Sequence, residues 1–475
     1  MVGTPLKTDR QTQSAAAQNP SAQNPSAQSP STQSPSTQSP STQSLAEQAK
    51  ALGIKFFLVS YTDLLGGTRA KLVPAAKIAS VEKDGAFFSS FASNLGLGPD
   101  AAEIAAIPDV SSLIQLPWEP TVGWVASKVY FEGKPFPAAP RMILSRVADE
   151  CEQMGYTYKA GVEAEFFLLK KTESGYAIAD ERDTAERPCY DQLNLMRQFD
   201  LISTIVGYME DLGWEPYQCD HEDANGQFEL NWGYSDAKTT CDRHVFFKYM
   251  VKTLAEKQGM TATFMPKPFA HITGSGGHVH SSLWQGETNS FEQDADEGGL
   301  SSVGYHFLGG VLKHAKGLTA LFAPTVNSYR RLGANATTSG STWTPRYISY
   351  GGNNRSHLLR IPEAGRFECR LIDGSANMYL ALAGLLAAGI DGLKNEISPG
   401  DRIDENLFAR GAEFPNLETL PTNLFEALTA LEQNPLLMNT LGELGAKTFF
   451  EFKRKEWGEF CSQVTNWEVD QYINI

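Results

Sequence analysis

The sequence lacks the features that mark membrane-spanning, secreted and zinc-finger proteins. None of its 475 residues belongs to an apolar run of the roughly 20 residues that a bilayer-spanning helix needs, and 379–390 is among the longest runs. The N-terminus has no apolar stretch of the kind found in signal peptides. The six cysteines are far apart and include no Cys-x-x-Cys pair. We therefore expect reduced core cysteines and a cytoplasmic protein with no membrane partner.

Positive charge is also scarce. The chain has 40 lysines and arginines against 55 aspartates and glutamates, which gives a net charge of −15. Nucleic-acid-binding proteins need a basic surface, so we expect no nucleic-acid partner. The sequence contains no G-x-x-x-x-G-K-[ST] loop. Any nucleotide must therefore be held by other groups.

Charged side chains are absent from residues 11–46, where prolines recur at every fifth position from Pro20 to Pro40. A segment of this composition cannot bury enough apolar surface to offset the entropy that it would lose on ordering. We expect residues 1–44 to form a disordered Pro/Ser/Gln-rich tail that takes no part in the chemistry.

The rest of the chain predicts an α+β fold in two parts. The apolar segment 54–60 predicts a strand, and the proline-rich segment 134–140 marks a domain boundary. Beyond it, helical and strand-like periodicities alternate; the expected helices are Ile143–Met154, Phe199–Leu212, His244–Gln258, Val303–Phe322 and Met378–Asn395. We predict a small β-rich domain at 45–140 and a large α+β domain at 141–475.

Four expected strands, at 161–170, 226–232, 277–284 and 366–372, each have one apolar and one polar face. The polar faces carry Glu163 and Glu165; Gln227, Glu229 and Asn231; His278, His280 and Ser282; and Arg366, Glu368 and Arg370. Any one of them alone would suit an ordinary half-exposed sheet. Together they differ from a solvated sheet, whose polar face is rich in lysine, threonine and serine.

If these faces converge, their carboxylates must be neutralised. Two carboxylates about 4 Å apart repel each other by about 4 kcal/mol at an effective dielectric constant of about 20. Many carboxylate oxygens with one or two imidazoles suit Mg²⁺ or Mn²⁺ better than zinc. With Glu222 added, we predict two divalent ions. His221 is expected to be a hydrogen-bonding residue and Asp223 a solvated neighbour.

Arginines cluster in the 41 residues from 330 to 370, a window without lysine. They are Arg330, Arg331, Arg346, Arg355, Arg360, Arg366 and Arg370. A guanidinium group can grip a carboxylate or phosphate through two parallel hydrogen bonds, which an ammonium group cannot do. A solvated basic surface is the alternative, but it would normally include lysine. Beside a two-metal site, the arginines indicate phosphoryl transfer to or from a carboxylate substrate.

At these residues the chain resembles the glutamine synthetase family, from about residue 50 to residue 475. The motifs occur in family order: the E-x-E strand (Glu163, Glu165), the HE…GQFE pair (Glu222, Glu229), GSGGHVHSS (Gly274–Ser282), NSYRRL (Asn327–Leu332), NRSHLLRIP (Asn354–Pro362) and RFECR (Arg366–Arg370). The resemblance implies a small N-terminal β-grasp domain and a catalytic domain with a curved antiparallel sheet. It also implies homo-oligomeric rings, with a dodecamer expected, whose active sites are completed by a neighbouring subunit's small domain.

The resemblance implies roles for single residues. One metal would be held by Glu165, Glu222 and Glu229, and a second, bridging the phosphates of ATP, by Glu163, His278 and Glu368. The substrate glutamate would be positioned by Gly274 and Arg331, and the transferring phosphoryl group would be contacted by Arg355 and Arg370. The nucleotide side would be lined by His280, Ser282, Arg360 and Arg366. Asp100 matches an acidic residue of the family's ammonium site.

The implied reaction has two steps. The γ-carboxylate of glutamate attacks the γ-phosphate of ATP, giving γ-glutamyl phosphate and ADP, and an amine then displaces phosphate. The metals and arginines would stabilise charge on the transferring oxygens. With ammonia, the family's commonest acceptor, the product is glutamine, and the enzyme belongs to nitrogen metabolism.

Two departures leave the acceptor amine open. The stretch 332–344 lacks the family's flap glutamate, and 86–90 lacks an aspartate that helps to bind ammonium. A site with less negative charge and more apolar surface suits a small alkylamine such as methylamine. The departures resemble the subgroup of type III glutamate–ammonia ligases and γ-glutamylmethylamide synthetases. A catalytically silent ring-former and a two-metal hydrolase without nucleotide are alternatives of other classes.

Overall fold

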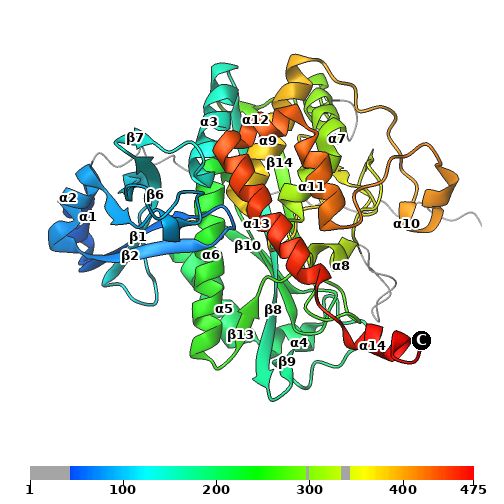
Figure 1. Cartoon of the computed structure of the whole chain (residues 1–475), viewed down its shortest axis with the longest axis horizontal. Coiled ribbons are helices and arrows are strands. Elements are labelled where there is room, and N and C mark those ends of the chain that lie inside the picture. The colour runs from blue at the N-terminus through cyan, green and yellow to red at the C-terminus, as the bar shows by residue number, and fades with distance from the viewer. Residues whose placement is uncertain (1–42, 296–298, 333–342) are drawn as a thin grey trace, which may run out of the picture. The chain divides into compact units, whose positions relative to one another are not determined.

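The structure is a computed structural model that describes residues 43–295, 299–332 and 343–475 (Figure 1). Residues 1–42 of the predicted tail and 333–342 of the predicted flap lie outside the described residues. Ser44 forms a capping box with Glu47 at the start of α1 (Leu45–Leu52). In the part of the chain that the structure describes, no helix is long and apolar enough to cross a membrane.

The first sheet is built from residues 56–135, and its main strands follow the order β2-β1-β6-β4-β3. Their bounds are β1 (Phe56–Thr62), β2 (Thr68–Pro74), β3 (Ala86–Phe88), β4 (Ile104–Pro108) and β6 (Val122–Phe131), while β5 (Ile114–Gln115) and β7 (Lys134–Pro135) pair with β6. β1 and β6 run parallel, and the other pairs are antiparallel. α2 (Ile78–Asp84) packs against β4. The predicted domain boundary at residue 140 stays a prediction.

The second sheet contains all four strands with a predicted polar face. Its order is β10-β11-β8-β14-β18-β17-β16. The bounds are β8 (Thr157–Thr172), β10 (Pro216–His221), β11 (Gln227–Trp232), β14 (Gly277–Gln285), β16 (Tyr350–Gly351), β17 (Leu359–Glu363) and β18 (Arg366–Cys369), with β9 (Gly175–Ile178), β12 (Ser235–Asp236), β13 (Thr261–Thr263) and β15 (Thr288–Asn289) beside them. Only β16 and β17 pair in parallel among these described strands. The predicted α+β class and antiparallel sheet are confirmed.

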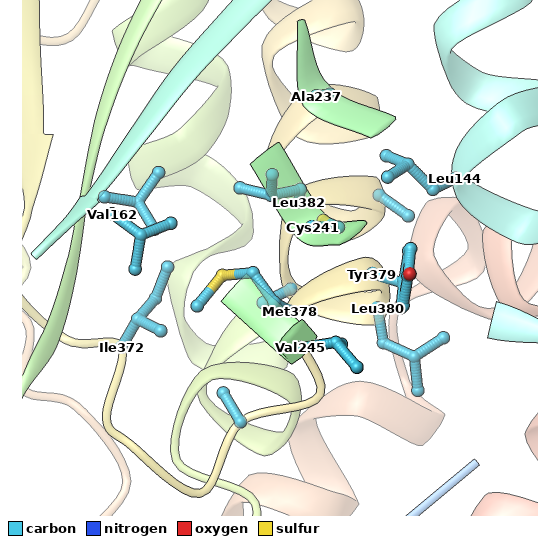
Figure 2. Packing of buried hydrophobic residues seen from close by; sticks show 14 of the residues in the cluster. Leu144, Val162, Ala237, Cys241, Val245, Ile372, Met378, Tyr379, Leu380 and Leu382 are labelled. Atoms are coloured by element: carbon cyan, nitrogen blue, oxygen red, sulfur yellow. The ribbon is translucent and has the colours of Figure 1, made fainter. Parts of the chain in front are cut away.

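Helices supply most of the remaining core. Their bounds are α3 (Pro140–Gln153), α4 (Gln192–Arg197), α5 (Phe199–Asp211), α6 (Ala237–Lys257), α7 (Ser302–Phe322), α8 (Ser328–Leu332), α9 (Met378–Lys394), α10 (Leu407–Arg410), α11 (Leu424–Glu432), α12 (Pro435–Leu441), α13 (Glu443–Cys461) and α14 (Asn466–Tyr472). α9 is apolar on nearly all sides, so it is buried along most of its length. Figure 2 shows Leu144 of α3, Val162 of β8 and Cys241 of α6 near residues of α9.

The predicted helices are confirmed to within a few residues, except at the start of α6. This helix begins at Ala237, well before the expected His244, because the Asp236 carboxylate accepts hydrogen bonds from the first-turn backbone. All six cysteines are free, and three are buried as expected. Cys461 is exposed, so the expectation of a core position is wrong for that residue.

A buried ion-pair network joins α3, α6 and α9 to the loop after β4. Arg141 donates from Nε and Nη2 to the carboxylate of Asp242 (2.9 and 2.8 Å), and Nη2 also donates to Asp109 (2.9 Å). The hydroxyl of Tyr379 donates to Asp242 (2.6 Å). Burial favours the neutral form of Asp109, but Arg141 outweighs it and holds the pKa at about 2. Asp109 is therefore ionised beside the guanidinium group of Arg141.

Replacing Arg141 by methionine is expected to lower the free energy of unfolding by about 3–5 kcal/mol, because the buried carboxylate of Asp242 loses its cation and the half-buried Asp109 loses one of its two. Urea unfolding measures the change. Arg454→Met is the control, since Arg454 and its partner Glu432 have side chains 51% and 49% exposed. An exposed pair contributes about 0–1 kcal/mol, so equal losses in the two variants would contradict the expectation.

Candidate active site

The polar faces of β8, β11, β14 and β18 form one acidic cluster in the second sheet. The register places Glu165 opposite Glu229, His278 opposite Glu163, and His280 opposite Glu368. Side chains directly opposite each other on antiparallel strands have Cβ atoms about 4.5–5.5 Å apart. The structure thus brings together residues that the sequence placed on separate strands.

Three groups of side chains in this acidic cluster have ligand atoms within 4.8 Å of one another. They are Glu165, Glu222 and Glu229; Glu163, Glu229 and His278; and Glu163, His280 and Glu368. Donor sets dominated by carboxylate oxygens fit a hard divalent cation. The first group is the one expected from the sequence. His280, expected on the nucleotide side, lies beside Glu163 and Glu368.

In the second expected ligand set, both carboxylates lie close to the His278 ring. Nδ1 of His278 lies 3.3 Å from Oε2 of Glu163 and 3.4 Å from Oε1 of Glu368. The same nitrogen lies 3.8 Å from Oε1 of Glu165. His278 therefore faces members of both expected metal sets.

Neutral groups hold the carboxylates of the first group. Nε2 of Gln227 donates to Oε2 of Glu165 (2.9 Å), and the backbone N–H of Gly276 donates to the same oxygen (2.7 Å). Nδ2 of Asn231 donates to Oε1 of Glu229 (3.0 Å). These contacts orient the carboxylates but supply no positive charge. The charge of Glu165 therefore acts unopposed on Glu222 and Glu229.

Carboxyl pKa values in this part of the acidic cluster are raised. Burial raises the pKa of Glu222 well above its ordinary value, and the charges of Glu165 and Asp220 raise it further. Burial, followed by the charges of Glu163 and Glu222, does the same to the pKa of Glu229. Burial is also the largest cause that raises the pKa of Asp220, to about 6. Burial and mutual repulsion thus favour the protonated forms of these groups, and a bound divalent ion would favour the ionised forms of its ligands.

The metal-free protein is expected to lose stability as the pH rises from about 4.5 through about 6. The folded-state pKa values of Asp220, Glu222 and Glu229 lie above their unfolded values, so the folded state binds more protons in this window. The stabilisation present at lower pH is therefore lost as the pH rises. Tm scans of metal-stripped protein should show this fall, and added Mg²⁺ should raise the Tm more at higher pH. A metal-free Tm that climbs with pH would count against these shifts.

Two arginines occupy the other side of the acidic cluster. Nη1 of Arg360 and Nη1 of Arg370 donate to the two carboxylate oxygens of Glu368 (2.7 and 2.5 Å). Burial opposes the ionisation of Glu368, but Arg370 and His278 outweigh it and hold the pKa at about 2. The acidic cluster therefore has a proton-holding side and a fully ionised side.

A third arginine reaches the cluster through His280. Nη1 of Arg366 lies 2.9 Å from Nδ1 of His280, and Nε2 of the ring lies 2.8 Å from Oε1 of Glu163. A guanidinium group only donates, so Nδ1 accepts and Nε2 donates to the carboxylate. Burial favours the neutral form of Glu163, but the neighbouring imidazoles outweigh it and lower its pKa. Ser282, two residues further along the same face, accepts from Nε1 of Trp284 (2.9 Å).

The two residues expected to position glutamate lie next to this cluster. Arg331 is 3% exposed, its Nη2 donates to the carbonyl of Arg370 (3.2 Å), and the same nitrogen lies 3.4 Å from Nε2 of His278. Gly274 accepts a hydrogen bond from Gln227 through its carbonyl (3.2 Å). A Cβ at position 274 would lie 2.1 Å from a backbone oxygen, so only glycine fits.

Two expected site residues do not join the acidic cluster in the described chain. Asp100 is exposed in the loop before β4. Arg355 is also exposed, and the charges of Arg355 and Glu222 both act on the thiol of Cys189. Burial raises the pKa of Cys189 to about 12; Glu222 adds to this shift, and Arg355 opposes it. Phe87, within the segment that lacks the family aspartate, is 48% exposed.

Sequence reasoning missed one acidic residue of the site and misplaced another. Asp220 lies opposite Glu229 on β10 and two residues before Glu222, so the alternation used for the other strands could have found it. Asp223, expected to be solvated, is 7% exposed, and its Oδ2 accepts a hydrogen bond from Thr273 (2.6 Å). That expectation is wrong, because the loop before β14 covers the turn after β10.

Comparisons with known proteins agree with this geometry. The family model described as glutamine synthetase, catalytic domain, matches residues 137–472. A glutamine synthetase of Rhizobium leguminosarum bv. phaseoli is 48% identical over 429 residues, which cover 90% of this chain and 98% of the relative. A glutamate–methylamine ligase of Methyloversatilis universalis is 40% identical over 429 residues, which cover 89% and 97%.

Solved structures give the same result. A structure of GmaS in complex with ADP aligns with 91% of this chain and 99% of its own, at 54% identity and a TM-score of 0.87. A structure of GmaS without ligand aligns with a TM-score of 0.86 at 53% identity. The second alignment likewise covers 91% of this chain and 99% of its own. The chain belongs to the glutamine synthetase family.

Proposed function

We propose that the protein is an ATP-dependent ligase that joins an amine to the γ-carboxylate of glutamate. The observation that carries the proposal is a cluster of buried carboxylates bordered by the guanidinium groups of Arg360 and Arg370. Carboxylates alone would suit a two-metal hydrolase, whereas arginines stabilise charge on a transferring phosphoryl group. A silent ring-former has no need of these groups, and all six expected metal ligands are gathered here.

Two ions, Mg²⁺ or Mn²⁺, complete the site in this proposal. One is held by Glu165, Glu222 and Glu229. The other is held by Glu163 and Glu368 together with His278 or His280. When bound, such ions neutralise the phosphates of ATP and polarise the γ-phosphoryl group.

The protein's own side chains bind and orient the two substrates. Arg331 binds the α-carboxylate of glutamate, and Gly274 leaves room for its main chain. Arg370 and Arg355 stabilise charge on the γ-phosphoryl group, while the nucleotide is lined by His280, Ser282, Arg360 and Arg366. The γ-carboxylate oxygen attacks the γ-phosphorus and releases ADP, which gives γ-glutamyl phosphate. The amine nitrogen then attacks the acyl carbon, loses a proton and releases phosphate.

Ammonia is the first candidate for the acceptor, with glutamine as the product. Methylamine is the second candidate, and one observation favours it: Phe87 and Phe88 occupy the segment where an ammonium-binding aspartate is expected. An aromatic ring there adds apolar surface and removes negative charge, which suits a methyl group better than a fourth N–H.

The proposal includes a second copy of the chain. Asp100 is exposed and lies outside the cluster of its own chain, so it would reach the amine only in a neighbouring subunit of a ring, with a dodecamer as the expected size. The reaction is placed in the cytoplasm, where free cysteines such as those found here persist.

Phosphate release tests the proposed function. The protein is given ATP, Mg²⁺ and glutamate with ammonia, methylamine, ethylamine or putrescine at equal free-base concentrations, and the amide product is identified by mass. We expect release that requires both glutamate and an amine, fastest with ammonia. Faster release with methylamine would support the second candidate. ATP hydrolysis without glutamate would contradict the ligase, and no release with any amine would support the silent ring-former.

A further inference from the structure

A second hydrogen-bond network lies directly behind Glu222. His221, the last residue of β10, is fully buried at 0% exposure. Its Nε2 lies 2.8 Å from Oδ2 of Asp183, and its Nδ1 lies 2.9 Å from the carbonyl oxygen of Glu222. A carbonyl oxygen and a carboxylate are acceptors, so each ring nitrogen faces an acceptor. The ring is thus held at both ends, and one end grips the main chain of Glu222.

Asp183 gathers four donors around one carboxylate. Oδ1 accepts from the amides of Asn194 (2.7 Å) and Asn225 (2.8 Å), and Oδ2 accepts from the backbone N–H of Gly226 (2.5 Å) as well as from His221. Burial favours the neutral carboxyl, but these hydrogen bonds outweigh it and lower the pKa of Asp183. The carboxylate therefore ties α4 to the turn that joins β10 to β11.

Glu222 needs such support more than its two companions do. Glu165 and Glu229 lie on strands β8 and β11 and are fixed by the sheet, whereas Glu222 lies in the turn after β10. Its backbone N–H donates to the carbonyl of Gln227 (2.9 Å), which closes the turn. The carbonyl side of the same residue is held by the His221 ring. The main chain of Glu222 is therefore held on both its N–H and its carbonyl side.

We propose that Asp183 and His221 are positioning residues that hold the carboxylate of Glu222 in place for the ion it shares with Glu165 and Glu229. This inference rests on the proposed function, in which Glu222 is a metal ligand. Removing a group that orients a metal ligand typically costs about 10–100-fold in metal affinity. The affinity for this ion should decrease while the affinity for the other ion stays the same. Turnover at saturating metal should change little.

A second His–Asp pair, with a buried histidine and a half-buried aspartate, provides a control. Nε2 of His314 lies 2.9 Å from Oδ2 of Asp391, its Nδ1 lies 2.9 Å from Nδ2 of Asn434, and His314 is 8% exposed. The pair joins α7 to α9, and neither residue belongs to the acidic cluster. His314→Leu should therefore destabilise the protein by removing the buried partner of Asp391, without changing the metal site.

The test measures Mn²⁺ binding to the full-length protein by electron paramagnetic resonance of the free ion. Asp183→Asn and His221→Leu should each weaken the binding of one of the two Mn²⁺ ions by about 10–100-fold. The Mn²⁺ concentration for half-maximal ADP release should rise by the same factor, with kcat at saturating Mn²⁺ within about threefold of the parent value. His314→Leu should leave both affinities unchanged while its Tm falls.

The outcomes separate this inference from the proposed function. Parent-like Mn²⁺ affinity in Asp183→Asn, with a Tm loss like that of His314→Leu, would overturn the positioning role and leave the ligase standing. Glu229→Gln tests the ligand set itself, because it must remove one bound ion from the parent count. If it does not, the metal assignment fails together with the proposed function. If His221→Leu does not fold, Asp183→Asn, which keeps the side-chain shape, decides the question.

Discussion

Glu368→Gln is expected to lower ADP release by about 1,000-fold with every acceptor amine, equivalent to about 4 kcal/mol of lost transition-state stabilisation. Glu368 is fully buried, accepts hydrogen bonds from Arg360 and Arg370, and faces the imidazole of His278. An uncharged amide cannot balance two guanidinium groups and cannot replace a carboxylate ligand. Initial rates at saturating glutamate and Mg²⁺, with Mn²⁺ binding in parallel, measure the effect.

The same hairpin provides the control for this substitution. Glu363 also pairs with an arginine, Arg366, but its side chain is 66% exposed. Glu363→Gln should therefore change activity and stability little, since exposed pairs contribute about 0–1 kcal/mol. Glu368→Gln should in addition lower the free energy of unfolding by about 3–5 kcal/mol, because buried arginines lose their partner. Activity of the Glu368 variant within tenfold of the parent would remove this residue from the site.

Gly276→Ala is expected to lower kcat by about 100-fold or more while the protein stays folded. A Cβ at this position would lie 2.6 Å from Nε2 of His278 and 2.8 Å from Oε1 of Glu165, both far inside van der Waals contact. The backbone N–H of Gly276 also donates to Glu165 (2.7 Å). A single methyl group would therefore displace two expected metal ligands at once. Metal affinity and kcat should fall together.

Gly207→Ala is the matched control for the glycine substitution. Gly207 lies in α5, where an added Cβ meets nothing within 4 Å. Alanine in a helix interior is favoured over glycine by about 0.5–1 kcal/mol, so this variant should be fully active and slightly more stable. Equal activity of the two alanine variants would mean that position 276 has more room than the structure shows.

The convergence of the acidic cluster could be predicted from alternation along single strands. On β8, side chains two residues apart share a face, which put Glu163 and Glu165 together before any fold was known. The same rule paired His278 with His280 on β14. If these strands are neighbours in one sheet, their carboxylates, imidazoles and guanidinium groups must lie on the same face. The family resemblance added roles that alternation alone cannot assign.

Contacts between distant segments could not be predicted in this way. Asp183 and His221 are 38 residues apart, and Asp183 lies in a loop whose sequence has no periodic pattern. The pairing of Arg360 with Glu368 depends on a register shift in the β17–β18 hairpin, which follows from packing and not from residue type. The raised pKa values also depend on burial, which a strand pattern indicates only in part.

Diffraction from crystals grown with Mn²⁺ tests the central claim most directly, because the ion scatters anomalously. We predict one anomalous peak within ligand distance of Glu165, Glu222 and Glu229. A second peak should lie among Glu163, Glu368 and one of the two histidines, His278 or His280. Well-ordered glutamates at these positions with no anomalous peak between them, at Mn²⁺ concentrations that support turnover, would contradict the account.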